Sequence, residues 1–151
     1  YEEALREAGV PYVTVAGRGY YDRQEVWDLL ALLDALYNTD DDLALATVLR
    51  SPLFNLSDEA LYGLRLPKPE ASGNPTLWKA LQNYMATRVP TAEMATAARA
   101  RQILTDLRDV AGRVTIYELL REALAQTGYL ATLTGFPDGV RRRNNVLKLL
   151  Q

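Results

Sequence analysis

Apolar residues recur along most of the chain at the three- and four-residue spacing that is typical of amphipathic helices. The clearest stripe follows residue 22, and we expect a helix that starts at Asp22, with Glu25 as its capping-box partner. Weaker stripes predict further helices in the rest of the chain. The stripes lie within residues 26–37, 43–49, 61–64, 77–85, 94–111, 116–127 and 140–150.

Polar residues before these stripes predict helix caps. Ser57 precedes one stripe, and Thr115 with Glu118 predicts a second capping box. Asn74 and Pro75 suit an N-cap and a first helical position. Three consecutive Asp residues at 40–42 fit a helix start, where amides and the helix dipole stabilise carboxylates, and a hard-cation site is the alternative. Capping is favoured because consecutive side chains on a helix point in different directions.

One segment breaks the helical pattern. Residues 10–15, VPYVTV, are β-branched and aromatic with Pro near the start, which predicts a strand. A lone strand would leave its backbone donors and acceptors unpaired, so we infer that its sheet partners lie outside this sequence. The predicted fold class is mainly α, an irregular bundle of seven or eight helices with one short N-terminal β-strand orphaned from a parent sheet. Because the chain begins without Met and ends within a helical pattern, we expect a piece of a longer protein.

Composition narrows the chemistry that the chain can carry. The 151 residues include no Cys and no His, which excludes disulfides, thiolate metal sites and catalysis by Ser-His-Asp or Cys-His arrangements. No apolar run approaches the roughly 20 residues that span a bilayer, and no signal peptide is visible. We therefore expect a cytoplasmic protein without a membrane partner.

The charge is unevenly distributed. Residues 1–80 carry 7 Lys/Arg and 13 Asp/Glu, whereas residues 81–151 carry 10 and 6, within a net charge of −2. This balance predicts no broad basic face for nucleic acid. Any contact with DNA must be local and depend on a few Arg side chains.

The turn before the first strong stripe, GRGYYDRQEVWD at residues 17–28, is rich in polar and aromatic groups. Single strands are held by aromatic stacking and by cations on phosphates, and Arg18, Tyr20, Tyr21 and Arg23 supply both kinds of group. The alternatives are that a Tyr packs in the core and that Arg23 pairs with a neighbouring carboxylate.

The densest basic cluster is Arg141, Arg142 and Arg143, followed by Asn144 and Asn145. It can bind phosphates, and the alternative is a solvated helix start. These three arginines join the candidate DNA-binding residues.

Three stretches carry a family resemblance. EEALREAGVPYVTVAGRGYYDRQEVWDLLALL and DDDLALATVLRSPLFNLSDEAL resemble UvrD/Rep-type superfamily 1 DNA helicases, and TGYLATLTGFPDGVRRRNNVLKLL resembles their AddA-like helicase–nuclease branch. The run at residues 20–26 and the segment at residues 49–53 are the most specific parts. The resemblance implies that residues 1–37 are the end of the second RecA-like motor domain, and that residues 38–151 are the inserted helical accessory domain, packed as one unit.

The resemblance also implies a function. Family members move 3′ to 5′ on single-stranded DNA with ATP and Mg²⁺, in repair and recombination, and AddA-like proteins work beside a nuclease partner subunit. Arg50 and Ser51 match an accessory-domain turn that touches duplex phosphates, although residues 54–56 replace its Gly-rich part.

No GxxxxGK[ST] loop is present, so this chain alone should not hydrolyse ATP and should hold no cofactor. We expect DNA positioning and motor gating within an ATP-dependent DNA helicase. The alternative is a helical interaction module that docks a partner subunit through the Trp27 and Trp78 surfaces.

Overall fold

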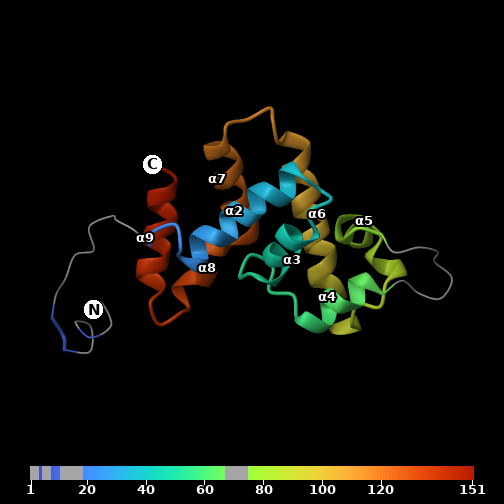
Figure 1. The fold of residues 1–151 in the computed structure, drawn as a ribbon, viewed down its shortest axis with the longest axis horizontal. Helices are drawn as coiled ribbons and strands as arrows, with labels where there is room; N and C mark the ends of the chain where they lie inside the picture. The colour runs from blue at the N-terminus through green and yellow to red at the C-terminus, as the bar shows by residue number, and fades with distance from the viewer. Residues whose placement is uncertain (1–3, 5–7, 11–18, 67–74) are drawn as a thin grey trace.

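The computed structural model describes residues 4, 8–10, 19–66 and 75–151. Within these ranges the chain forms eight α-helices and no sheet, which confirms the prediction of a mainly α fold (Figure 1). The strand predicted at residues 10–15 lies, apart from Val10, outside the described residues. The helices are α2 (Gln24–Tyr37), α3 (Asp42–Arg50), α4 (Asp58–Arg65), α5 (Leu77–Gln82), α6 (Met94–Val110), α7 (Ile116–Thr127), α8 (Tyr129–Thr134) and α9 (Gly139–Leu149), with 3-10 turns at Tyr84–Ala86 and Thr91–Glu93.

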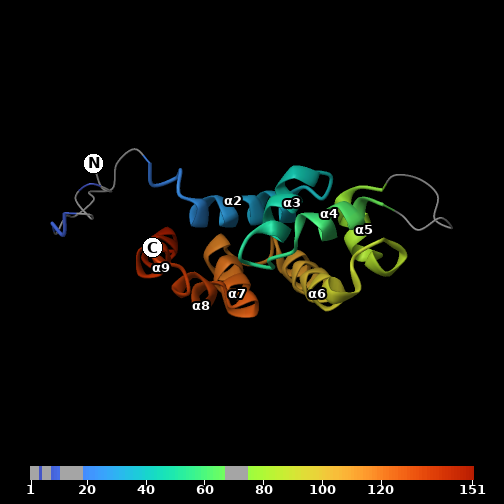
Figure 2. The same ribbon diagram turned by 90° about the horizontal axis from the view of Figure 1, so that it is seen from below.

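Helix α2 crosses the middle of the molecule. It packs against α3, α6 and α9, so helices from both ends of the sequence meet along it. In Figure 2, α2 and α3 form one layer above a row made by α6, α7, α8 and α9, with α4 and α5 at one end. Residues of α2 belong to the same core cluster as residues of the helices that follow it. The division into residues 1–37 and 38–151 stays a prediction.

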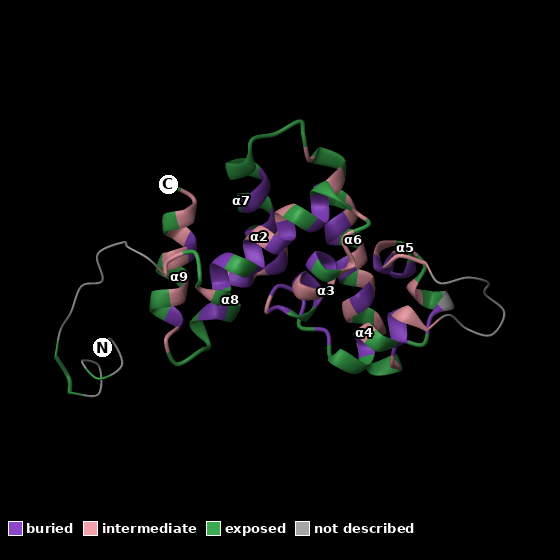
Figure 3. Ribbon diagram, viewed as in Figure 1, coloured by how far each residue is buried: buried purple, intermediate pink, exposed green. Residues whose placement is uncertain are grey.

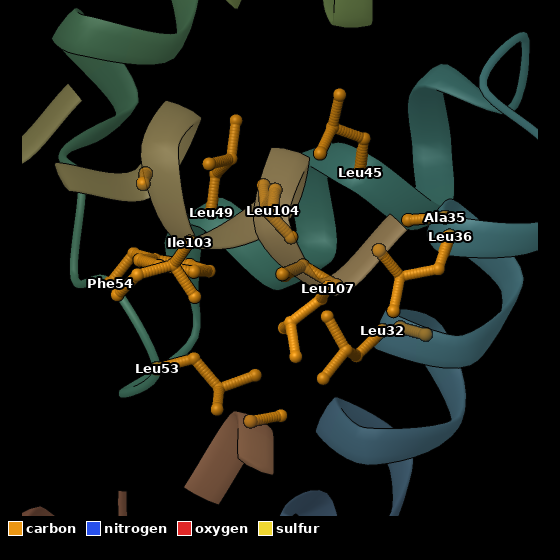
Figure 4. Packing of buried hydrophobic residues seen from close by; sticks show 14 of the residues in the cluster. Leu32, Ala35, Leu36, Leu45, Leu49, Leu53, Phe54, Ile103, Leu104 and Leu107 are labelled. Atoms are coloured by element: carbon orange, nitrogen blue, oxygen red, sulfur yellow. The ribbon is translucent and has the colours of Figure 1, made fainter. Parts of the chain in front are cut away.

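The core is mostly aliphatic, and one dense part of it lies between α2, α3 and α6. Leu104 and Leu107 of α6 meet Leu45 and Leu49 of α3 and Leu32 of α2 (Figure 4), and each is almost completely buried. Burial of one such side chain stabilises the fold by about 1.5–3 kcal/mol relative to exposure. Figure 3 shows the buried faces turned toward one another and the exposed faces outward.

Most of the predicted caps are present. Asp41 accepts from the Ala44 amide at the start of α3, and Ser57 accepts from the Ala60 amide at the start of α4. Thr115 and Glu118 make the predicted capping box at the start of α7.

The acidic run at residues 40–42 acts through hydrogen bonds and an ion pair. Besides the Asp41 cap, Asp42 accepts a 2.6 Å hydrogen bond from the Leu77 amide and pairs with Arg65 at 2.7 Å. In the described ranges no group of three carboxylates is arranged to hold a metal ion.

Two predicted helix starts are wrong. Helix α2 begins at Gln24 with Arg23 in the N-cap position and no side-chain cap, instead of at Asp22. The reason is that Glu25, the expected capping partner, turns inward to accept from Asn145. Helix α5 begins at Leu77 and is capped by Thr76, not by a residue before Pro75.

Several residues of the predicted apolar stripes are exposed, among them Leu43, Met85, Ile116 and Val140. Ile116, in the first turn of α7, and Val140, in the first turn of α9, are 64% and 73% exposed. No helix in the described ranges combines the length and the apolar character that crossing a bilayer requires.

Helices α8 and α9 pack unusually closely at their junction. A Cβ on Gly139 would meet the Leu133 carbonyl oxygen, and it would lie 2.7 Å from the Thr134 Cα. The absence of a side chain at Gly139 therefore permits the close approach of α9 to the end of α8, which sets where the basic helix lies.

Candidate nucleic-acid interface

The turn before α2 presents one exposed aromatic ring and one that is held in place. Tyr21 is 66% exposed, whereas the hydroxyl of Tyr20 donates a 2.7 Å hydrogen bond to the Asn145 carbonyl oxygen. The two rings meet edge to face, with centroids 5.2 Å apart. Burial raises the pKa of Tyr20, and the adjacent Tyr21 and Glu25 raise it further, so the phenol stays a donor.

Helix α9 carries the predicted arginine cluster. Asp138, the residue before the helix, pairs at 2.7 Å with both Arg141 and Arg142. The hydrogen bond from Arg142 is the main reason that the pKa of Asp138 is lowered, and the bond from Arg141 lowers it further. Arg142 also lies over the Phe136 ring, whereas Arg143 is exposed and pairs with no acidic group among the described residues.

A further cation of α9, Lys148, contacts the aromatic turn. Its ammonium nitrogen lies 5.2 Å from the centroid of the Tyr20 ring. Lys148 and Asn145 both contact Tyr20, so the second half of α9 adjoins the aromatic turn. Arg141 and Arg142, by contrast, contact Asp138 and Phe136 at the start of the helix. An open hollow of about 620 Å³ beside α9 is lined by Thr134, Phe136, Pro137, Asp138, Gly139, Val140, Arg141, Asn144 and Asn145.

Two buried carboxylates of α2 join the helices beneath this surface. Glu25 is 4% exposed and accepts a 2.6 Å hydrogen bond from the Asn145 side chain. One turn further along α2, Asp28 is 1% exposed and accepts from Tyr129 at 2.6 Å and from Gln24 at 2.8 Å.

Burial dominates the electrostatics of the second carboxylate. It raises the pKa of Asp28, against the lowering effect of the hydrogen bonds from Tyr129 and Gln24. Burial and the nearby Asp28 raise the pKa of Tyr129 far above its usual range, so Tyr129 remains a hydrogen-bond donor. The neutral Tyr129 hydroxyl therefore donates to the buried Asp28 carboxylate, and this bond holds α8 against α2.

The remaining predicted residues are placed differently. Arg50 pairs at 2.9 Å with Asp58 on an exposed surface at the end of α3. The Ser51 hydroxyl is buried, donating to the Val48 carbonyl and accepting from the Leu53 amide, so it shapes the turn. Arg18 lies outside the described residues, and Arg23 is half-buried at the start of α2.

Sequence reasoning did not select Lys148, Asp28 or Tyr129, which join α8 and α9 to α2 and to the turn before it. Asp28 could have been noticed, because a carboxylate four residues from Leu32 lies within the apolar stripe of α2. No local pattern indicates its partner Tyr129, which is 101 positions away. These contacts exist only because α2, α8 and α9 pack together in the folded chain.

Comparison with known proteins leads to the same family that the sequence motifs resemble. Residues 1–71 match the UvrD-like helicase C-terminal domain family. The chain is also similar to proteins named as the A subunit of an ATP-dependent helicase/nuclease. The one from Oceanobacillus iheyensis is 27% identical over 148 residues, which are 97% of this chain and 12% of the relative.

Two further relatives bear the same name. The protein from a Thermoanaerobacter species is 30% identical over 152 residues, covering 99% of this chain, and that from Bacillus pumilus is 31% identical over 147 residues, covering 97%. The chain spans about 12% of the length of each. These matches show that the chain belongs to the UvrD-like helicase family, on the branch formed by the A subunits of ATP-dependent helicase/nucleases.

Proposed function

We propose that the chain positions DNA and gates the motor within an ATP-dependent 3′–5′ DNA helicase of repair and recombination, without carrying the catalytic centre. The observation that carries this proposal is the contact of the aromatic turn before α2 with Lys148 of α9. Arginine and lysine on phosphates and an aromatic ring under a base are the two groups that bind single strands.

The names of the relatives support the wider setting. They are ATP-dependent helicase/nuclease subunits, and the chain corresponds to about 12% of their length. Because these residues contain no phosphate-binding loop, ATP and Mg²⁺ would act elsewhere in the whole protein. The contribution of this chain is then to hold DNA.

Gating follows from the same contacts. Helix α2 packs on α9 at the basic surface and on α3 and α6 in the core. A movement of α9 on binding DNA would therefore be transmitted along α2 into the core of the chain. In the whole protein, this is a physical route by which bound DNA can alter closure of the motor.

Binding to labelled single-stranded and forked DNA at two salt concentrations tests the positioning role. We expect a dissociation constant in or below the range of about 10⁻⁴–10⁻⁶ M that is typical of non-specific binding, weakening as salt rises. The triple variant R141A/R143A/K148A should bind more weakly and with a shallower salt dependence. Its matched control, K79A/R113A/R121A, removes three exposed cations from other parts of the surface and should bind like the unmodified chain. Absence of salt-dependent binding, or equal loss in both variants, would refute the positioning role.

The whole protein tests polarity and gating. Unwinding should require a 3′ single-stranded tail, and the same triple variant should lower the stimulation of ATP hydrolysis by DNA while leaving DNA-independent hydrolysis unchanged. Unwinding from a 5′ tail alone would refute the proposed direction. Unchanged stimulation by DNA in the variant would refute gating through α9.

A second candidate function has its own observation. Apolar side chains stand exposed beside a groove of about 450 Å³ between α2 and α7, with Tyr37 91% exposed at its edge and Ile116 also lining it. Trp27, on α2, is 53% exposed, whereas Trp78 is half-buried under Arg108. As the alternative role we propose docking of a nuclease partner subunit, because the relatives are named as subunits. Loss of partner binding in I116S, with DNA binding retained, would support it, and retained partner binding would argue against it.

A further inference from the structure

We propose that Asn145 is a positioning residue that holds α9 and the aromatic turn before α2 together as one preformed surface for unpaired nucleotides. This inference rests on the proposed DNA-positioning function and deepens it. It assigns to one residue, through its side-chain amide and its backbone carbonyl, the task of keeping the aromatic turn in register with α9.

Asn145 is bonded to the other end of the chain in two ways. Its side-chain amide donates to Glu25 at 2.6 Å, and its backbone carbonyl accepts from the Tyr20 hydroxyl at 2.7 Å. The two bonds join residues that are 120 and 125 positions apart. Because Glu25 is 4% exposed, water cannot readily replace the amide as its partner.

The surface that results combines two kinds of group. Tyr21, which is exposed, rests edge-on against Tyr20, whose ring also lies beside Lys148. An unpaired base can stack on Tyr21 while an adjacent phosphate meets Lys148. The ligand that this spacing suits is a flexible, unpaired strand, because a paired base presents no free face for stacking.

The two bonds of Asn145, to Glu25 and to Tyr20, form a clamp that preorganises the surface before DNA binds. Without it, α9 and the turn would have to be ordered when the strand binds, and that ordering would weaken binding. With it, cations and ring are already in place. The contact with Lys148 is kept only while the Tyr20–Asn145 bond holds the ring beside α9.

The neighbouring asparagine provides a matched control. Asn144 is exposed and makes no hydrogen bond through its side chain to any described residue. N145D and N144D change the net charge of the chain equally, but only N145D places a carboxylate against Glu25. The double variant E25Q/N145D restores the hydrogen bond with donor and acceptor exchanged. Binding of each to a fluorescein-labelled oligothymidylate, measured across a salt series, isolates the clamp.

We expect N145D to bind more weakly than N144D, with a salt slope shallower by about 0.7 for each phosphate that the variant no longer neutralises. E25Q/N145D has the same net charge as the unmodified chain, and it should recover the affinity and the slope of the unmodified chain. A purely structural role would not produce this recovery of the slope. Circular dichroism reports the folded fraction of each variant. If N145D unfolds, N145A removes the bond to Glu25 and Y20F removes the bond to the Asn145 carbonyl, in each case with a neutral side chain.

Equal affinities and slopes for N145D and N144D in folded protein would overturn the inference while leaving the proposed function intact. Failure of the unmodified chain to bind the oligothymidylate in a salt-dependent manner would overturn the proposed function, and the inference with it. Failure of E25Q to rescue N145D would overturn the role of the Glu25 bond.

Discussion

The hydroxyl of Tyr129 donates a 2.6 Å hydrogen bond to the carboxylate of Asp28, and both residues are almost completely buried. One lies at the start of α8 and the other in α2, 101 positions apart. The bond satisfies the only polar atom of a large buried side chain and one oxygen of a buried acid. It is the central polar contact in the part of the fold that supports the candidate interface.

Removing that hydroxyl should weaken the fold. Y129F leaves the Asp28 carboxylate with one donor, and because bonds to charged groups are worth about 1.5–3 kcal/mol, we expect a loss of that size in the free energy of unfolding. The cost should be smaller in the D28N background, where the acceptor is a neutral amide. Urea unfolding followed by circular dichroism measures both. Y37F, at a 91% exposed ring, should have little effect, and an equal loss in Y129F and Y37F would contradict the assignment.

The raised pKa of Asp28 predicts a specific dependence of stability on pH. The folded state binds the proton of Asp28 more tightly than the unfolded state does, so this residue contributes stability that is present below its ordinary pKa and is lost as pH rises through the raised value. D28N removes the effect. The stability of D28N relative to the unmodified chain should therefore rise from acidic to neutral pH, measured by urea unfolding at several pH values.

The carboxylate of Asp138 should behave in the opposite way. Its pKa is lowered, chiefly by the hydrogen bond from Arg142, so its stabilisation is present above its ordinary pKa and disappears as pH falls through the lowered value. The stability of D138N relative to the unmodified chain should fall from acidic to neutral pH. Parallel trends for D28N and D138N in the same titration would show that at least one of the two environments is wrongly assigned.

The capping box of α7 should be worth a measurable amount. T115A removes the side chain that accepts from the Glu118 amide and should lower the free energy of unfolding by about 0.5–2 kcal/mol. T115S keeps the hydroxyl and serves as the control. Thermal unfolding of the three proteins decides the matter, and a serine variant as unstable as the alanine variant would show that the methyl group, not the cap, is responsible.

Close packing at the α8–α9 junction should make Gly139 intolerant of a side chain. The added Cβ of G139A would collide with backbone atoms of Leu133 and Thr134, which cannot move as a flexible side chain can, so we expect a loss of about 1–3 kcal/mol. V140A changes the next residue, which is exposed, and should remain within about 0.5 kcal/mol of the unmodified chain. Denaturant unfolding that finds the two variants equally stable would rule out the tight junction.

Much of the helical pattern could be predicted because its causes are local. Ser57 and Thr115 cap their helices through bonds that reach three residues along the chain, so their identities are sufficient to predict them. Glu25 shows where local reasoning fails. Its spacing from Asp22 suits a capping box, but in the packed structure its carboxylate bonds to a residue 120 positions away. Ile116 fails for a related reason, because periodicity predicts an apolar stripe without predicting how far the neighbouring helices cover it.

The candidate site was predictable in its parts. Tyr20, Tyr21 and the arginines at 141–143 could each be selected as candidates by residue type, since aromatic rings and cations are the groups that usually bind single strands. Lys148 could not be selected, because a single lysine on a helix surface has no distinguishing local pattern. Its significance comes from lying beside the Tyr20 ring.

The amino-acid sequence by itself determined that the protein is mainly helical, where most helices begin and end, and that chemistry based on His or Cys is absent. These properties depend on side-chain identity and on hydrogen bonds within about four residues. Only the tertiary structure decided that Asn145 bonds to Glu25 and Tyr20, that Tyr129 bonds to Asp28, and that α9 lies beside the aromatic turn. Such pairs depend on how several amphipathic helices bury their apolar faces together, and that packing brings together residues whose sequence positions carry no mark of each other.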